Sequence, residues 1–157
     1  MANFTALAAA RHRVLAQEGW DVDTDGLFGA PPITIIVGEE VHPTLLKSLG
    51  LLGLGRHRVV PVAVDGQGRI RTETFPDISG PTIVCLQAGN VNTGAFDPAT
   101  ELCARLLRFA FEETTLPRIT AVTDPDNANP SPSRIDARAR SPTRSGTPEA
   151  SVSIWHW

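Results

Sequence analysis

Two polar segments of the sequence stand where chemistry is expected. His42 lies between a β-branched run at residues 33–37 and a leucine-rich segment that begins with Pro43. The segment Asn90–Gly94 follows a second apolar run and precedes a predicted helix that Asp97 caps. In open α/β sheets, ligands bind beyond the carboxyl ends of the strands, and both segments fall there. Each also has a structural interpretation, because His42 could cap or pack its helix and Asn90–Gly94 could be a polar turn.

Other groups that often carry out chemistry show no matching pattern. The four histidines, at positions 12, 42, 57 and 156, have no ligand spacing with a nearby acid, so no metal site is expected. The glycine-rich run at residues 50–55 follows a predicted helix instead of joining a strand to one, which indicates a helix end and not a phosphate loop. Lys47 is the only lysine among the 14 basic residues, so a covalent amine has one candidate side chain.

Composition excludes several classes of protein. The 157 residues carry a net charge of −3, which argues against a nucleic-acid partner. No apolar run approaches the roughly 20 residues that span a bilayer, and no secretory signal precedes the first helix. Cys85 and Cys103 sit in apolar segments and are expected to be buried free thiols. These features predict a cytoplasmic protein without a membrane or nucleic-acid partner.

The elements that would position the two polar segments alternate along the first part of the chain. Apolar strands are predicted at residues 33–37, 59–63 and 82–86, separated by helices, which favours an α/β fold with a mostly parallel sheet. Residues 1–115 are therefore interpreted as one α/β domain. Residues 116–157 are rich in proline, serine and arginine and are predicted to form a low-complexity, disordered tail, although 119–124 is strand-like.

Four motifs, in order, resemble the pyridoxal-phosphate-dependent group II decarboxylases, the family of the aromatic amino acid and glutamate decarboxylases. Met1–Arg11 is similar to the helix that follows the phosphate loop of that family, and His42–Ser48 resembles its His-x-Ser-x-x-Lys-Ala motif with threonine in place of serine. Val60–Val62 followed by Asp65–Gly68 is similar to its next strand and turn. Gly89–Pro98 resembles its Gly-Thr-Thr-x-x-Gly-x-x-Asp segment. The resemblance covers about residues 1–105.

This resemblance implies a fold and a chemistry. The expected fold is a fragment of the large domain of a fold-type I pyridoxal phosphate enzyme, with helices flanking the sheet. The family activity is decarboxylation of a small-molecule amino acid, and the complete enzyme is a homodimer. The histidine that matches His42 stacks on the cofactor ring, and Asn90 would lie near the cofactor and the substrate carboxylate.

Departures from the family pattern limit what this chain would do alone. The phosphate cradle of the family lies just upstream of the segment that matches Met1, and the acid that holds the ring nitrogen has only Asp124 as a late, poorly placed candidate. Lys47 matches the lysine of the histidine motif, not the lysine that binds the cofactor covalently. A partial decarboxylase, inactive alone and without covalent cofactor, is therefore the expectation.

Two other interpretations stay open. One is a small non-catalytic α/β module whose tail binds a partner. The other is a doubly wound enzyme that binds a nucleotide or sugar, which is disfavoured because no glycine-rich fingerprint joins the first strand to its helix.

Overall fold

A computed structural model describes residues 2–78, 80–112, 118–123, 136–138 and 151–156, with side chains up to residue 105. Its helices and strands follow one another in this order: α1 (Ala2–Gln17), α2 (Val22–Asp25), β1 (Thr34–Gly38), α3 (Pro43–Leu51), β2 (Val59–Val62), a 3-10 helix (Thr72–Thr74), β3 (Thr82–Leu86), α4 (Ala99–Glu112), β4 (Arg118–Thr123), β5 (Asp136–Arg138) and β6 (Ser151–His156).

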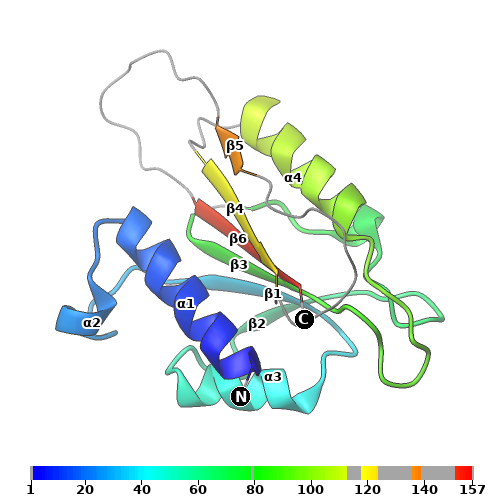
Figure 1. Cartoon of the computed structure of the whole chain (residues 1–157), viewed down its shortest axis with the longest axis horizontal. Coiled ribbons are helices and arrows are strands. Elements are labelled where there is room, and N and C mark those ends of the chain that lie inside the picture. Colours follow the sequence, from blue (N-terminus) through cyan, green and yellow to red (C-terminus); the bar gives the residue numbers. More distant parts are fainter. Residues whose placement is uncertain (1, 79, 113–117, 124–135, 139–150, 157) are drawn as a thin grey trace.

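The strands form one sheet in the order β2-β1-β3-β6-β4-β5, in which every neighbouring pair is parallel except β4 and β5. Helices α1 and α3 lie on one side of this sheet and α4 on the other (Figure 1). The crossovers from β1 to β2 and from β3 to β4 thus place α3 and α4 on the two faces of the sheet, as the alternating pattern predicts. The expected α/β fold with a mostly parallel sheet is confirmed.

Alternate residues of the central strands explain why helices cover both faces. Ile35 and Val37 of β1 pack in the cluster that includes Leu7 of α1 and Leu45 of α3. Ile36, one position along, packs in the other cluster with Leu102 of α4. Side chains of a strand point alternately to its two faces, so a strand that is apolar at every position is buried on both. All five residues of β3 are buried accordingly.

The expectation of a disordered tail differs from the structure in three short segments. Arg118–Thr123, Asp136–Arg138 and Ser151–His156 are strands, and the last of these pairs with both β3 and β4. Residues 124–135 and 139–150 lie outside the described residues, so the expectation stays untested there, as does the domain boundary at residue 115. The short apolar end of the chain finds its partners in a sheet made by distant residues, which its own composition does not reveal.

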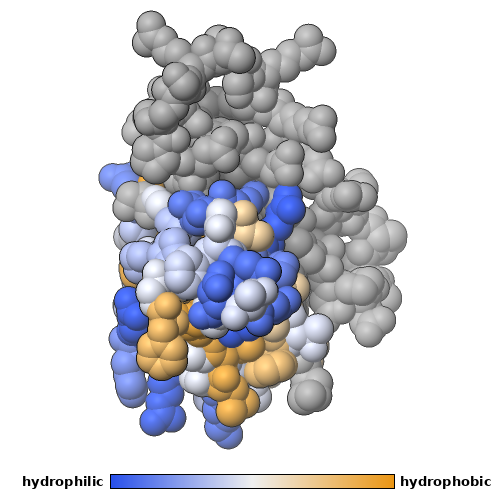
Figure 2. Space-filling view, turned by 90° about the vertical axis from the view of Figure 1, so that its left-hand side faces the viewer, coloured by the Kyte–Doolittle hydropathy of each residue, from blue (hydrophilic) through white to orange (hydrophobic). Residues whose placement is uncertain are grey.

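Exposed apolar side chains are few within the described part of the molecule. Phe28 is 98% exposed and Leu51 78% exposed. Figure 2 looks at the side where α2 and the end of α3 lie, and it shows apolar side chains gathered low on that face, beside hydrophilic ones. In the described residues no helix is long and apolar enough to cross a membrane.

Candidate active-site edge

The carboxyl ends of β1 and β3 bring the two predicted site segments to one edge of the sheet. The strands are parallel neighbours, with Ile36 of β1 level with Val84 of β3. His42 follows β1 and opens α3, whereas Asn90 follows β3. The shared edge is therefore the position at which the topology predicts ligand binding.

His42 has a defined structural role as the N-cap of α3. Its Nδ1 accepts a hydrogen bond from the backbone N–H of Thr44 at 3.3 Å and lies 2.8 Å from the Thr44 hydroxyl. The side-chain amide of Asn3 donates to that hydroxyl at 3.1 Å, which directs the hydroxyl proton toward Nδ1. An Nδ1 that accepts hydrogen bonds leaves the proton of the neutral ring on Nε2. Thr44 thus uses its hydroxyl to orient the ring.

The loop after β3 is closed by Asn90 itself. The side chain of Asn90 is 5% exposed, and its Oδ1 accepts from the backbone N–H of Asn92 at 2.9 Å and of Thr93 at 3.3 Å. On its other side, a Cβ added to Gly68 would lie 2.5 Å from Asn90 Nδ2, so the amide packs directly on that glycine. The groups of this loop that face solvent are Asn92 and Thr93, not the Asn90 amide.

A tight turn after β2 supports this loop. The carboxylate of Asp65 accepts hydrogen bonds from the backbone of Gln67 and from the backbone and guanidinium of Arg69. The Arg69 backbone bond first, and then its guanidinium, lower the pKa of Asp65 to about 2. Thr93 donates its hydroxyl to the Gln67 carbonyl at 2.7 Å and so attaches the Asn90 loop to the turn. Gly68 permits this approach because its φ is +78° and it has no Cβ.

Asp97 links the residue after β3 to the segment that follows the Asp65 turn, and the sequence did not identify it as a site residue. Its carboxylate accepts the backbone N–H of Gln87 at 2.6 Å and of Ile70 at 2.8 Å, and the side chain is 7% exposed. The sequence analysis assigned Asp97 only to the start of the helix that follows. The neighbouring residues gave no signal of this burial, since Phe96 is 51% exposed.

The cavity enclosed at this edge is small. Its lining includes Glu40, Gly68, Cys85 and Asp97, and its volume is about 10 Å³, room for one water at most. Burial raises the pKa of Cys85 to about 12, so its thiol is neutral and not a nucleophile. Burial also raises the pKa of Cys103. Both cysteines are free, which confirms the expected buried thiols.

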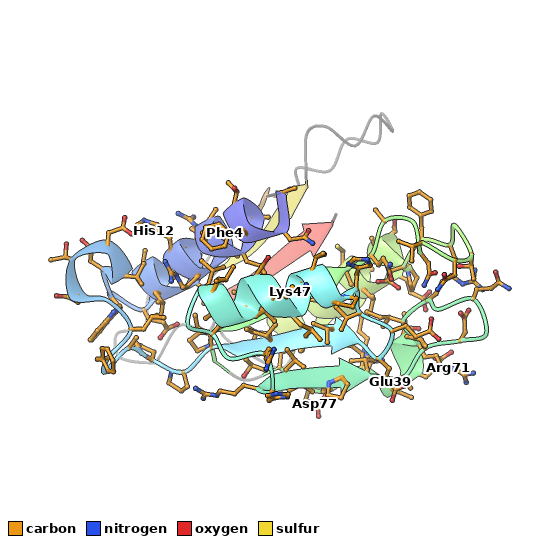
Figure 3. The ribbon with its side chains drawn as sticks, turned by 90° about the horizontal axis from the view of Figure 1, so that it is seen from below. Phe4, His12, Glu39, Lys47, Arg71 and Asp77 are labelled. Atoms are coloured by element: carbon orange, nitrogen blue, oxygen red, sulfur yellow. The ribbon has the colours of Figure 1, made fainter. Side chains whose placement is uncertain are left out.

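Of two further residues that the sequence singles out, Lys47 and Asp124, the structure describes only Lys47. Lys47 is exposed and lies midway along α3, where it lines a groove of its own surface and not the cavity at the sheet edge (Figure 3). Asp124, the late candidate for the ring nitrogen, lies outside the described residues. Among the residues that the structure describes, no three histidine, cysteine or acidic side chains are grouped to hold a metal ion.

Comparison with known proteins finds similar decarboxylases. No family model matches the chain. The acidic amino acid decarboxylase GADL1 of Bos taurus is 29% identical over 110 residues, which cover 65% of this chain and 20% of that protein. The aspartate 1-decarboxylase of Aliivibrio fischeri is 33% identical over 119 residues, with 65% and 22% covered.

Solved structures agree with these relatives. The crystal structure of mouse CSAD in apo form matches with a TM-score of 0.53 and 27% identity, and covers 66% of this chain and 23% of that one. The chain resembles part of a group II decarboxylase. The resemblance to the pyridoxal-phosphate-dependent family, predicted from four motifs, is thereby confirmed.

The likeness to group II decarboxylases extends to the fold but covers only part of those proteins. The glutamate decarboxylase domain of a Vibrio parahaemolyticus enzyme, at 20% identity and a TM-score of 0.56, shares the fold. The chain spans about a fifth of the length of the curated relatives that it matches. Roles for His42 and Asn90 remain predictions from the motifs.

Proposed function

We propose that this chain forms one wall of the cofactor site in a pyridoxal-phosphate-dependent decarboxylase of amino acids, with His42 against the cofactor ring. The observation that carries the proposal is the placement of His42. Its ring follows the carboxyl end of β1 and is held by Thr44, and the neighbouring parallel strand β3 ends at the same edge of the sheet. A planar, oriented imidazole at that edge has the geometry to hold an aromatic ring flat.

Among the described residues, His42 is proposed to meet the ring of the cofactor, whereas the cavity at this edge, with a volume of about 10 Å³, is too small to admit that ring. The cavity at the edge has two carboxylates, Glu40 and Asp97, and no basic side chain in its lining, so it offers nothing that would hold a phosphate. Lys47 is exposed on the surface of α3 and lines a different groove. Partners for the phosphate and for the aldehyde carbon must therefore come from outside the described residues, and no reaction step is assigned to this chain alone.

The loop after β3 takes a different part in this proposal from the one that the motifs imply. The Oδ1 of Asn90 is already used inside its own turn, so we assign Asn90 the shaping of the loop. The Thr93 hydroxyl is likewise used, since it donates to the Gln67 carbonyl, so the exposed side chain of Asn92 is the polar group of this loop that we assign to substrate contact. The names of the relatives support an acidic amino acid as the substrate, and we extend the proposal to a homodimer in the cytoplasm, where the free thiols stay reduced.

A chimaera tests the proposal. Residues 2–105 of this chain would replace the matched segment of the Bos taurus relative, which supplies the remaining parts of an active site. We expect the chimaera to retain pyridoxal phosphate and to release CO₂ from an acidic amino acid, measured with labelled carboxyl carbon. A folded chimaera that retains the cofactor and releases no CO₂ would count against a decarboxylase role for this segment.

A further inference from the structure

A groove lies on the outer side of α3, away from the sheet edge described above. Its volume is about 600 Å³, and its lining combines the exposed residues of α3 with the loop that leads to β2. The floor is formed by Leu46, Gly50, Leu51 and Gly55, and Leu51 is 78% exposed. We call this feature the α3 groove.

Glycines keep the α3 groove open. A Cβ added to Gly50 would meet no atom within 4 Å, so the space above this residue is vacant in the described structure. Gly55 has a φ of +78°, and the aliphatic stem of Arg58 lies over it, since an added Cβ would be 3.1 Å from Arg58 Cδ. Packing of the stem on glycine brings the Arg58 guanidinium to the rim, as long basic side chains commonly arrange themselves over apolar surface.

The charge around the α3 groove has one sign. Its rim carries Lys47, Arg56 and Arg58, with His57 beside them, and none of its lining residues is acidic. No Asp or Glu occurs between Glu40 and Asp65, in a chain whose net charge is −3. Within the described part of the chain, the salt bridges are His12 with Asp23 and Arg69 with Asp65, so the rim cations have no acidic partner there.

We propose that the α3 groove binds an acidic peptide segment that carries a large apolar side chain. An apolar side chain would cover the Leu46 and Leu51 floor, and carboxylates on either side would meet the three rim cations. A nucleic-acid backbone would pair with the rim but leave the leucines uncovered. A membrane surface is matched by several protruding apolar side chains, whereas Leu51 is the one large apolar side chain of this lining that is mostly exposed. The groove lining on α3 runs from Leu46 to Leu51, about 6–14 Å along the helix axis from His42, and shares no residue with the cavity at the sheet edge, so the inference is independent of the proposed function.

Binding would be measured by fluorescence anisotropy on the full chain. The probe is a labelled synthetic peptide with a central Leu-Phe pair flanked by glutamates. We expect binding that weakens as salt is raised, and no binding of peptides in which lysines replace the glutamates or alanines replace the Leu-Phe pair. Equal binding of the lysine peptide would overturn the proposal.

Two variants locate the binding on the groove. Gly50→Met places a side chain in the vacant space without a clash and is expected to abolish binding while the thermal midpoint is retained. Lys47→Glu combined with Arg58→Glu should weaken binding by about tenfold or more, because two attractions become repulsions. Arg13→Glu, on the exposed side of α1, changes charge outside the groove and should leave binding unchanged.

Other occupants would give distinct results. Self-association of the chain that Gly50→Met abolishes, measured by sedimentation, would assign the groove to a second copy and overturn the peptide proposal. Binding to vesicles of anionic phospholipid that the same variant abolishes would assign it to a membrane surface, with the same consequence. Peptide binding that is unchanged in Gly50→Met would place the site elsewhere.

Discussion

Replacing Asp97 by alanine is expected to lower the free energy of unfolding by about 3 kcal/mol. The carboxylate accepts two backbone N–H groups, those of Gln87 and Ile70, at a position that is 7% exposed. Alanine would leave both donors without this partner in a buried place, and an unsatisfied buried donor costs about 1–3 kcal/mol. The loss should appear as a lower urea midpoint of the full chain with an unchanged slope.

A matched control separates burial from charge. Asp77 is exposed and lies near β2 (Figure 3). Asp77→Ala therefore removes the same charge, and we expect it to change the free energy of unfolding by no more than about 0.5 kcal/mol. Asp97→Asn should fall between the two, because its amide oxygen can accept one backbone bond while its NH₂ opposes the other. If Asp97→Ala and Asp77→Ala unfold at the same urea concentration, Asp97 does not join these elements.

Replacing His42 by alanine in the chimaera is expected to lower decarboxylation by roughly 10²-fold, the scale for loss of a group that positions the reacting ring. His42 has two roles in the account, as the N-cap of α3 and as the residue facing the cofactor ring. His42→Ala removes both, and the loss of the cap alone would cost about 1 kcal/mol of stability. Activity by itself therefore does not distinguish the roles.

His42→Asn makes the distinction. Asparagine is a good N-cap, so it should keep α3 stable, but it has no ring to place against the cofactor. We expect His42→Asn to match the activity loss of His42→Ala while it retains the stability of the parent chimaera. His12→Ala, at an exposed position on α1, is the matched control and should leave activity unchanged. Full activity in His42→Asn would assign His42 to capping alone.

The central strands could be predicted because their signal is local. Residues 33–37, 59–63 and 82–86 are apolar runs, and the structure has strands at Thr34–Gly38, Val59–Val62 and Thr82–Leu86. A run that is buried on both faces needs no knowledge of its partners to be recognised. The parallel order of β1 and β2 then follows from the helix between them.

The site was less predictable because its contacts are distant in sequence. Asp97 and Ile70 are 27 positions apart, and Thr93 and Gln67 are 26 apart. Neither pair has a spacing that a pattern reveals. The Asx turn of Asn90 with Asn92 and its contact with Gly68 are also not visible in the sequence, and the expected place of Asn90 near the cofactor stays a prediction. The short strand β6 likewise depends on β3 and β4 for its pairing.

The most direct test of the central claim is to find which lysine holds the cofactor in the chimaera. Borohydride would reduce the cofactor adduct, and peptide mass mapping would locate the pyridoxyl group. The account predicts a stoichiometric label on a lysine of the Bos taurus portion and none on Lys47, because Lys47 is exposed on α3 and lines a groove other than the cavity at the sheet edge. A stoichiometric label on Lys47, together with decarboxylation, would contradict it.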